Sequence, residues 1–392
     1  MIAYYISNFP KLSEKFVSRE ISLIRSKNRN IKIFASFGPE KKIIDQLDNE
    51  ELKLKNSTEY ITRLTAIFYL IAYLHISIKY FKKAYKLSNE ATNKVNPFIL
   101  LGRAIYLSKK SSNLNISHIH AHWPYATMAV YLSNLISSIN YSISIHAHEM
   151  FHEFGHFDRC LPNVKFISFC NNAAMKVVIE RYPNLSNRCH LIYHGIDTDF
   201  FNYIKPKNKI DKTINLIAGG RLTKTKGIHR LINSCSYCIK MGFNLKLIIF
   251  GEGPEKKNLE KLVSDLHIEN NVRILGWISS KELRNLVADS DLFCLLADTN
   301  YHDGIPNVFV ESMSIGRPVI SSKLPAISEL IYHNENGFII DNKDDEKEFL
   351  EIIEYLYKIN NLKKISLNAR KIVKENYDSS VLIDNLIDLL YD

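Results

Sequence analysis

The sequence DGIPNVFVESMSIGRPVI occupies residues 303–320 and predicts a loop followed by one short helix. Pro306 suits the first helical turn, because a missing backbone N–H costs nothing there. Gly316 and Pro318 should end the helix, since glycine accepts the left-handed conformation at a helix C-terminus and proline cannot continue the helix. The loop therefore leads into a helix N-terminus, which is a place where a protein can bind an anion.

Two carboxylates flank this helix start. Gly304 lets the backbone approach a ligand closely, and the amides of Asn307 and Val308 would point at an anion. Glu311 lies about one and a half turns into the helix, so it and Asp303 can hold polar groups on either side of that anion. A phosphorylated sugar fits this arrangement. For two carboxylates taken alone, the alternative is an ordinary loop and helix with surface acids.

A loop rich in cations follows another predicted strand. The loop GGRLTKTKG, at residues 219–227, begins with a turn that glycine permits and leads into a predicted helix. Arg221 offers a fork of donors and Lys226 a point charge, so together they can neutralise the charge that develops on a departing diphosphate. The loop is not a Walker A motif, because it lacks the G-x-x-x-x-G-K-[ST] spacing.

Short runs rich in β-branched residues alternate with helix-length segments along the chain. This alternation is typical of βα units around parallel sheets, and 392 residues exceed what one hydrophobic core usually supports. Ligands of such sheets bind beyond the carboxyl ends of the strands, and the motifs above follow strands. We predict one sheet with strands at 2–6, 31–36, 116–119, 141–145, 164–169 and 190–193, and a second with strands at 214–218, 245–250, 272–275, 292–296, 318–321 and 337–340.

The stretch from Asp303 to Pro318 resembles the E-x7-E region of family 4 glycosyltransferases, whose usual form is EGIPNVLLEAMA-x-G-x-PV. These are retaining enzymes of the α/β GT-B fold, with two Rossmann-like parallel-sheet domains facing across a cleft, and the resemblance implies that fold here. Asp303 replaces the usual first Glu and shortens its reach by one methylene group. The resemblance also implies that Glu311 binds the donor ribose, and that the donor sugar is held by Asp303 and the backbone of Gly304, Ile305, Pro306, Asn307 and Val308.

Three further segments of the second half resemble the same family, in the same order. GGRLTKTKG is similar to its G-R-L-x-x-x-K-G segment, which holds the donor diphosphate. Trp277 matches a position near the nucleobase, and a core tryptophan is the alternative. Gly251 and Gly253 match G-x-G-P, where we expect a structural role with backbone contact to the nucleotide. These matches imply a donor site that includes Gly220, Arg221, Lys226, Gly251, Gly253 and Trp277.

Two histidine-rich segments end predicted strands in the first half. HIHAHW at 118–123 and SIHAHE at 144–149 resemble the I-H-A-H and F-T-A-H-A-H-D-I segments of the exopolysaccharide and colanic-acid branch of the family. The resemblance implies that His146 faces the transferred sugar from the acceptor domain. Paired H-x-H motifs can also chelate zinc, but these enzymes generally need no metal, so we predict sugar contact and no metal site. On the same acceptor side, we expect packing or hydrogen-bonding roles for His120, His122 and His148.

Two more segments resemble that branch. NFPKLSEKF at residues 8–16 is similar to F-P-x-L-S-E-T-F, where Ser13 can face the diphosphate or the acceptor, or simply cap a helix. HGIDTDFF at 194–201 matches N-G-x-D-x-x-x-F, with His194 in place of Asn, and we expect a structural role for it.

The domain organisation follows from the strand series and the resemblance. We predict an acceptor-binding domain at 1–200, a polar linker at 201–212 and a nucleotide-sugar-binding domain at 213–376. One closing helical stretch runs through 362–390. By similarity to GT-B enzymes, residues 377–392 should pack back on the first domain.

The expected function is that of a retaining hexosyltransferase. It would move a hexose from a UDP- or GDP-linked sugar, without another cofactor and without an enzymic nucleophile, to a lipid-linked saccharide in capsule, exopolysaccharide or O-antigen assembly. The catalytic group would comprise His146, Arg221, Lys226, Asp303 and Glu311. One alternative is a nucleotide-sugar epimerase of similar fold, and another is an inactive membrane-associated sugar-nucleotide-binding protein. Glycoside hydrolysis needs two carboxylates and no phosphate, and Arg221 and Lys226 make it less attractive.

All the excess positive charge lies in the first half, where residues 1–200 hold 25 Lys and Arg against 15 Asp and Glu. Residues 60–110 alone hold nine basic side chains and one acid, Glu90. Aromatic side chains lie among the lysines at Tyr69, Tyr73, Tyr80, Phe81 and Tyr85. The apolar run 64–76 is too short to span a bilayer, which takes about 20 residues. The segment therefore reads as an interfacial surface attracted to anionic lipid. Nucleic acid is the rival partner, but no nucleic-acid-binding signature accompanies the patch, so we predict none.

Six cysteines lie in apolar surroundings without metal-ligand spacing, so we expect reduced core thiols. The only C-x-x-C, Cys235 and Cys238, falls in a helical pattern. The N-terminus lacks a basic stretch and an apolar h-region, so we expect no signal peptide and a cytoplasmic protein, peripheral on the inner face of the plasma membrane.

Overall fold

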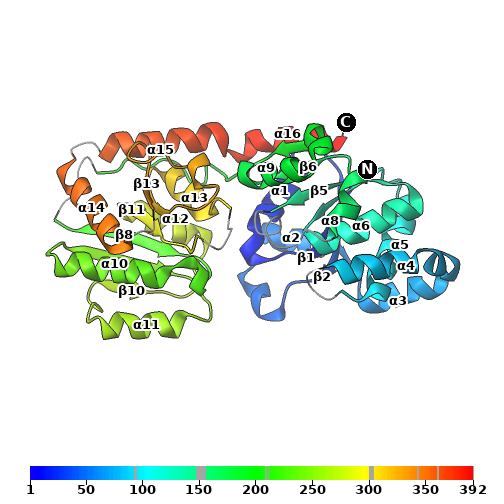
Figure 1. Cartoon of the computed structure of the whole chain (residues 1–392), viewed down its shortest axis with the longest axis horizontal. Coiled ribbons are helices and arrows are strands. Elements are labelled where there is room, and N and C mark those ends of the chain that lie inside the picture. The colour runs from blue at the N-terminus through cyan, green and yellow to red at the C-terminus, as the bar shows by residue number, and fades with distance from the viewer. Residues whose placement is uncertain are drawn as a thin grey trace. The chain divides into compact units, whose positions relative to one another are not determined.

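The computed structural model describes residues 1–91, 95–146, 156–207, 210, 212–299, 304–341, 344–359 and 362–391. The predicted site residues Asp303 and His148 lie outside the described residues. The chain divides into two compact units (Figure 1). Unit 1 comprises Met1–Gly195 and Ser380–Asp392, and unit 2 comprises Ile196–Ser379.

Unit 1 is built on a seven-stranded parallel sheet with the order β3-β2-β1-β4-β5-β6-β7. All six predicted strands are present, with ends shifted by a few residues. The short strand β3 was not predicted, because it has three residues and follows a helix with no turn residue between them. The strands are β1 (Ile2–Asn8), β2 (Ile31–Phe37), β3 (Thr58–Tyr60), β4 (His118–His122), β5 (Asn140–Ile145), β6 (Ile167–Phe169) and β7 (Cys189–Leu191).

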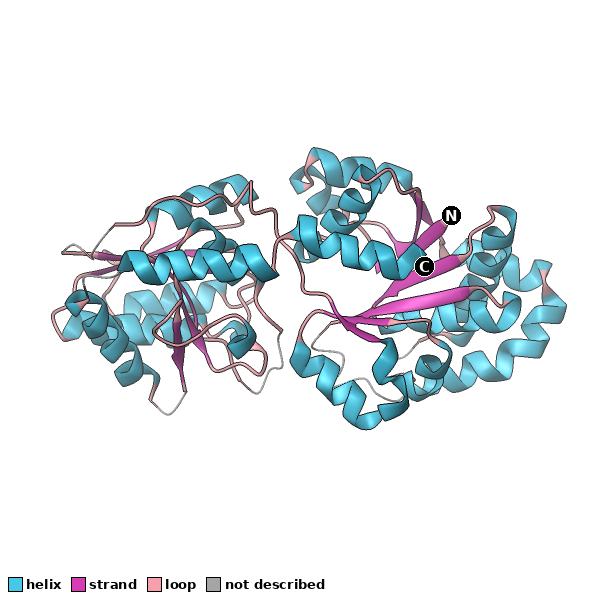
Figure 2. Ribbon diagram, turned by 90° about the horizontal axis from the view of Figure 1, so that it is seen from above, coloured by secondary structure: helices cyan, strands magenta, loops and turns pink. Residues whose placement is uncertain are grey.

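Helices cover both faces of this sheet and enclose two hydrophobic cores (Figures 1 and 2). One core lies under α3, α4, α5 and α6, and the other under α1 and the C-terminal helix. Ten of the 17 residues of helix α5 are buried, including Arg103. The helices of unit 1 are α1 (Lys15–Ser26), α2 (Asn49–Ser57), α3 (Arg63–Ala72), α4 (Leu74–Glu90), α5 (Pro97–Asn113), α6 (Pro124–Ser137), α8 (Phe157–Cys160) and α9 (Asn172–Arg181).

The closing helical stretch consists of two helices. Helix α15 (Leu362–Asn376) belongs to unit 2, and α16 (Ser379–Tyr391) packs almost entirely in unit 1. The break arises because the backbone between them pairs with Ile196, whose N–H donates to the Tyr377 carbonyl and whose carbonyl accepts from Ser379. Helix α16 then places Ile383, Leu386, Ile387 and Leu390 in the core beside β1, so both chain termini lie on unit 1 (Figure 2).

Unit 2 is built on a six-stranded parallel sheet with the order β10-β9-β8-β11-β12-β13, and all six of its predicted strands are present. These are β8 (Ile214–Gly219), β9 (Leu245–Phe250), β10 (Val272–Ile274), β11 (Leu292–Leu295), β12 (Val319–Ser322) and β13 (Phe338–Ile340). The remaining helices are α10 (Ile228–Lys240), α11 (Lys256–Asp265), α12 (Ser280–Asp289), α13 (Asn307–Ile315) and α14 (Asp345–Lys358). The prediction of two α/β parallel-sheet domains is therefore confirmed.

Unit 2 begins earlier than the predicted domain boundary. The segment that we expected to be a linker, 201–212, is part of unit 2. Phe201 and Ile210 are buried, and the N–H of Ile204 donates to the carbonyl of Ile315. The segment was mistaken for a linker because lysines and asparagines surround these apolar residues in the sequence.

Four of the six cysteines, Cys160, Cys235, Cys238 and Cys294, are buried thiols without a disulfide, as expected. Cys235 and Cys238 both lie on the buried side of α10. Burial raises the pKa of Cys238 to about 12, which keeps this thiol protonated and unreactive.

Candidate functional site

The predicted donor residues follow the strands at the centre of the unit 2 sheet. Strand β8 lies in the middle, and the strand order runs in opposite directions on its two sides, through β9 on one side and β11 on the other. In an open parallel sheet, the crevice at such a switch point is the place where ligands bind. The loop that carries Arg221 and Lys226 follows β8, and the segment that leads to α13 follows β11. Topology therefore brings two of the predicted motifs to one edge of the sheet.

Glycines allow close backbone contact between the loops that follow β8 and β9. A Cβ on Gly251 would lie 1.9 Å from the carbonyl oxygen of Gly220, and one on Gly253 would lie 2.4 Å from that of Leu222. The backbone N–H of Leu222 donates to the carbonyl of Glu252 at 2.9 Å. Only glycine allows this approach, so the G-x-G-P segment holds the β8 loop in place. This is the structural role that we expected for Gly251 and Gly253.

The loop that carries Lys226 is also fixed on its other side. Lys224–Lys226 form a single 3-10 turn, and Gly227 follows it in the left-handed conformation with φ of +62°. The N–H of Asp298, just beyond β11, donates to the carbonyl of Thr225 at 2.9 Å. Arg221 is exposed and Lys226 is half-buried. The two cations thus project from a backbone that is tied to both neighbouring strands.

Arg230, which the sequence did not single out, supports the same loop. Its guanidinium donates to the carbonyls of Leu296 and Ala297, both at 3.1 Å, and makes a bidentate ion pair with Asp345. Arg230 therefore ties α10 to the end of β11 and to α14. A single Arg in an amphipathic helix carries no signal of this role, because its partners at 296, 297 and 345 are distant in the sequence.

Helix α13 starts one residue later than predicted. Pro306 is the N-cap, with ψ of 123°, and Asn307 is the first helical residue. The proline side chain has no hydrogen-bond acceptor, so Pro306 occupies the N-cap position without making a side-chain hydrogen bond to the helix. Gly304 through Glu311 are partly exposed, apart from the buried Phe309 and Val310. The helix end is as predicted, with Gly316 left-handed at φ of +89°.

Trp277 is not a core residue. Its side chain is 42% exposed, which removes the core alternative. The preceding carbonyl, that of Gly276, accepts from the N–H of Gly251 at 2.9 Å, so Trp277 follows a residue that is fixed to the β9 loop. An exposed indole on a fixed backbone can stack on a planar base.

In unit 1, the histidines form a connected chain at the ends of β4 and β5. His120 shares hydrogen bonds with Ser142 at 2.7 Å and Ser144 at 2.8 Å. His122 Nδ1 lies 3.3 Å from His146 Nε2, and His146 Nδ1 lies 3.1 Å from His194 Nε2. His194, for which we expected a structural role, ends this chain of rings and stacks on Phe16 with ring centroids 3.8 Å apart.

His146 is neutral at physiological pH. Its pKa lies well below the usual value, because burial disfavours the charged ring and His194, His122 and His120 lie nearby. Both ring nitrogens are engaged by other histidines. A sugar hydroxyl would have to replace one of these hydrogen bonds, so the predicted sugar contact requires a rearrangement of the histidine chain.

Two groups of described residues bring potential metal-ligand atoms within 4.8 Å of one another. One comprises His146, Cys170 and His194, and the other Glu20, His120 and His122. In the second group, Glu20 also accepts from the Tyr4 hydroxyl at 2.7 Å. The serine and histidine hydrogen bonds account for much of this clustering without an ion.

Ser13 does not cap a helix. It lies exposed in a 3-10 turn, Leu12–Glu14, and the N-cap of α1 is Glu14, without a side-chain capping bond. The helix-cap alternative for Ser13 is therefore wrong, because α1 starts two residues after it. The predicted contact with diphosphate or acceptor remains a prediction.

We expect unit 1 to lose stability as the pH falls below 6.5. Burial lowers the pKa of His118 to about 3 and of His156 to about 4, and that of His120 lies well below its usual value. The unfolded chain then binds more protons than the folded chain, so each group costs about 1 kcal/mol between pH 6.5 and 5.5. Denaturant unfolding at both pH values measures this loss. Since burial also lowers the pKa of His146 and of His194, at least five rings contribute, and His118→Gln should reduce the loss by about one fifth. Equal stability at the two pH values would contradict the burial of neutral rings.

The comparisons with known proteins agree with this arrangement. Residues 199–372 match the sequence family described as "Glycosyl transferases group 1". The chain is 25% identical over 199 residues to the amylovoran biosynthesis glycosyltransferase AmsK of Erwinia amylovora, covering 50% of this chain and 49% of AmsK. It is 26% identical over 200 residues to the putative colanic acid biosynthesis glycosyltransferase WcaL of Escherichia coli, with the same coverage. The chain therefore matches about half the length of these relatives.

Solved structures share the fold over the whole chain. HepE of Anabaena, crystallised with UDP, superposes with a TM-score of 0.76 at 16% identity, covering 100% of this chain and 99% of HepE. TarM superposes with a TM-score of 0.72 at 14% identity, covering 100% of this chain and 99% of TarM. The predicted GT-B fold class and the resemblance to exopolysaccharide-type glycosyltransferases are both confirmed.

Proposed function

We propose that the chain is a glycosyltransferase of surface polysaccharide synthesis, because residues 199–372 match the family described as "Glycosyl transferases group 1". It transfers a hexose from a UDP- or GDP-linked sugar with retention of configuration. The observation that carries the proposal is the meeting of the cationic β8 loop and the α13 N-terminal segment at the switch point of the unit 2 sheet. HepE has been crystallised with UDP-glucose, which supports a nucleotide-sugar donor.

Each donor-side residue has a chemical task in this proposal. Arg221 and Lys226 neutralise the diphosphate as it leaves, and the N-terminus of α13 adds its partial positive charge. Glu311 accepts hydrogen bonds from the ribose hydroxyls, and Asp303 with the Gly304–Val308 backbone holds the sugar. Trp277 stacks on the base. The leaving phosphate accepts the proton of the incoming hydroxyl, so the reaction needs neither an enzymic nucleophile nor a metal ion.

Unit 1 supplies the acceptor side. We propose that Ser13, His146 and His148 contact the acceptor or the transferred sugar, and that the acceptor is a saccharide carried on a lipid. The basic segment 60–110 would hold the protein against the anionic inner face of the plasma membrane, which makes the chain a peripheral, cytoplasmic enzyme. Relatives with printed roles in amylovoran and colanic acid biosynthesis support the polysaccharide setting.

The test is transfer from radiolabelled UDP- and GDP-hexoses in the presence of lipid-linked acceptors. Glu311→Ala should lower kcat/KM by about 100-fold, because the transition state loses a charged hydrogen-bond partner. Asp303→Ala should behave alike and Asp303→Glu should stay active. Glu260→Ala, an exposed acid on α11, is the matched control and should match the parent. A chelator should leave the rate unchanged, and the product anomer should match that of the donor.

Other outcomes would overturn parts of this proposal. Unchanged turnover in both alanine variants would remove the site assignment. Conversion of the donor without any acceptor would favour the epimerase alternative, and donor binding with no turnover of any sugar would favour the inactive binding protein.

A further inference from the structure

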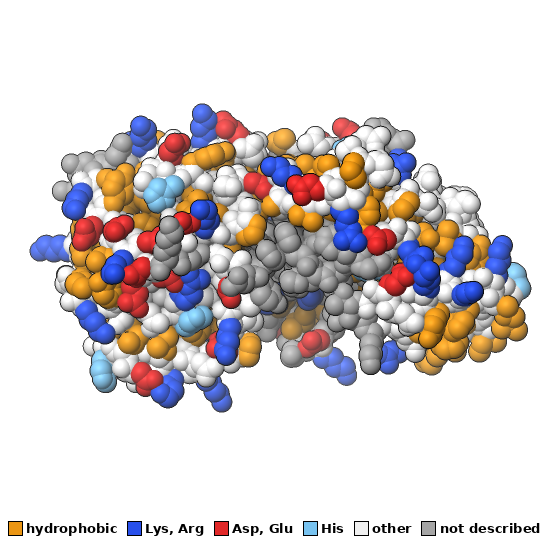
Figure 3. All heavy atoms as spheres, in the orientation of Figure 1, with side chains coloured by type: hydrophobic (Ala, Val, Ile, Leu, Met, Phe, Trp, Pro, Cys, Tyr) orange, Lys and Arg blue, Asp and Glu red, His pale blue; other side chains and the backbone are white. Residues whose placement is uncertain are grey.

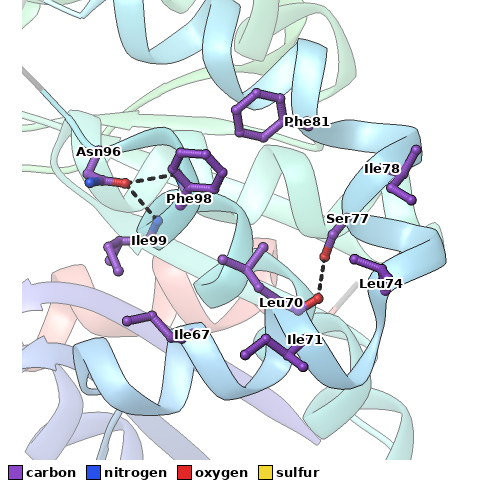
Figure 4. A pocket seen from close by; sticks show the side chains of 10 residues that line it. All are labelled: Ile67, Leu70, Ile71, Leu74, Ser77, Ile78, Phe81, Asn96, Phe98 and Ile99. Atoms are coloured by element: carbon purple, nitrogen blue, oxygen red, sulfur yellow. Dashed lines mark hydrogen bonds between the residues drawn. The ribbon is translucent and has the colours of Figure 1, made fainter.

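An apolar groove opens on the surface of unit 1, between α3, α4 and α5. Its volume is about 710 Å³, and eight of its ten lining residues are Ile, Leu or Phe (Figure 4). The two polar lining residues make hydrogen bonds within the protein. Ser77 Oγ donates to the Leu70 carbonyl at 2.8 Å, and Asn96 Oδ1 caps α5 by accepting from Phe98 and Ile99. The groove therefore suits a hydrocarbon occupant.

Two of the three helices around the groove, α3 and α4, expose apolar side chains that line the groove or lie beside it. On α3, residues 64, 67, 68 and 71 fall on one face at helical spacing, and Phe68 and Ile71 are 65% and 71% exposed. On α4, residues 74, 78, 81 and 85 form a second stripe, and Leu74 and Ile78 are 61% and 72% exposed. Hydrophobic side chains gather over this end of unit 1 in Figure 3. A water-facing helix normally presents polar residues in these positions.

The bent pair of helices α3 and α4, which we call the elbow (Arg63–Ala72 and Leu74–Glu90), is firmly held by the rest of unit 1. A Cβ on Gly102 of α5 would lie 2.2 Å from the Ala66 carbonyl oxygen, so α3 and α5 touch backbone to backbone. The hydroxyl of Tyr80 on α4 donates to the Leu135 carbonyl on α6 at 2.7 Å. No single described helix is long and apolar enough to cross a membrane, and α3 and α4, which pass that test only as a pair, are bent by 117°. The elbow can lie in one leaflet but cannot form a straight span.

The charges beside the elbow differ from those that the sequence suggested. Arg103 is 1% exposed and donates to the Ile61 and Ser36 carbonyls, so it belongs to the core and not to the basic surface. Lys94 lies outside the described residues. The one acid, Glu90, is paired with Arg159. A row of exposed lysines remains on α4, on the side next to the apolar stripe, at Lys79, Lys82, Lys83 and Lys86.

We propose that the α3–α4 elbow inserts into one leaflet of an anionic bilayer, with lipid hydrocarbon chains filling the groove and the α4 lysines at the headgroup level. The inference deepens the proposed function, since an acceptor carried on a lipid has to be met at a bilayer, but it stands on the geometry of unit 1 alone. Apolar faces bordered by lysines are typical of helices that lie in the membrane interface. A second copy fits less well, because it would bring two lysine rows together.

The first experiment locates the elbow in the bilayer. The full-length Ile71→Trp variant is mixed with vesicles of equal parts phosphatidylcholine and phosphatidylglycerol, with bromine on the acyl chains. The introduced indole should be strongly quenched. Leu367→Trp, at a 45% exposed position on α15, is the matched control and should not be quenched. Equal quenching of the two variants, or none in either, would overturn the insertion.

The second experiment separates insertion from surface charge. Phe68→Ser with Ile71→Ser should lower vesicle partitioning at least about tenfold at high salt, where charge is screened. Lys82→Gln with Lys86→Gln should lower it roughly fivefold per lysine at low salt. Met241→Ser with Leu367→Ser is the matched control on unit 2 and should bind as the parent does, and circular dichroism checks folding. Parent-like binding of the Phe68 and Ile71 double variant would refute the proposal, as would a dimer in solution that this variant dissociates.

These readouts do not depend on transfer activity. They use no donor, so an inactive Lys226→Ala variant should bind vesicles as the parent does. If the parent protein did not insert into vesicles but still transferred sugar to a water-soluble acceptor, this inference would be refuted and the proposed function would stand. Intact insertion with no transfer from any donor would refute the proposed function and leave this inference standing.

Discussion

Lys226→Ala is expected to lower kcat/KM for the nucleotide-sugar donor by about 100- to 1,000-fold, the range seen when one preorganised charge donor is removed from a transition state. Lys226 closes a 3-10 turn in which its own N–H donates to the Thr223 carbonyl at 3.1 Å and the next N–H donates to Lys224 at 3.0 Å. The Thr225 carbonyl accepts from Asp298 beyond β11. The ammonium group is therefore carried on a backbone that need not reorganise when charge develops on the leaving diphosphate.

The same turn provides the control. Lys224 has the same charge, sits two residues away and is exposed, so Lys224→Ala removes one cation from the same loop and should change kcat/KM less than about threefold, the scale of a screened surface charge. Initial rates over a range of donor concentrations separate kcat from KM. A fall in kcat would show that the ammonium acts in the transition state, and a rise in KM alone would show uniform binding. Equal effects of the two substitutions would refute a specific role for Lys226.

Gly227→Ala should be the most destabilising single change in unit 2 among those proposed, at on the order of 3 kcal/mol or more. Gly227 has φ of +62°, and a Cβ there would lie 1.7 Å from the Leu296 carbonyl oxygen at the end of β11. Since that oxygen also accepts from Arg230, the backbone has little freedom to move away. The clash would push the Lys226 turn away from β11, so donor affinity should fall together with stability.

A control substitution at Gly242 separates the steric clash from the cost of the left-handed backbone conformation. Gly242 has φ of +92°, but a Cβ there meets nothing within 4 Å, so Gly242→Ala carries only the conformational penalty of about 1 kcal/mol. Thermal unfolding followed by calorimetry should place the unit 2 transition of Gly227→Ala roughly 6–12 °C below that of the parent, and that of Gly242→Ala only a few degrees below. If both variants melted alike, the close approach of Gly227 to β11 would be refuted.

The sequence predicted the sheets better than it predicted the surfaces. Twelve strands were expected and all are present, because most of them fall in short apolar runs bounded by turn signals. The three-residue strand β3 has no such signal. The sequence also located the predicted donor motifs after the correct strands, because a tight turn at the end of a strand requires glycine and is therefore visible in the sequence. The burial of Arg103 was not predictable, because its acceptors are carbonyls at Ile61 and Ser36, far away in sequence.

By itself, the sequence determined the two parallel α/β sheets, the order of their strands along the chain and the glycine and cation motifs that follow β8 and β9, because these features arise from local periodicity and local backbone requirements. The tertiary structure alone decided which distant groups meet. It joined His194 to His146, tied the Lys226 turn to β11 through Arg230 and Asp298, and left the apolar faces of α3 and α4 turned outward. An apolar helical stripe reads the same whether it is buried or exposed, so only packing against α5 could show which face remains open.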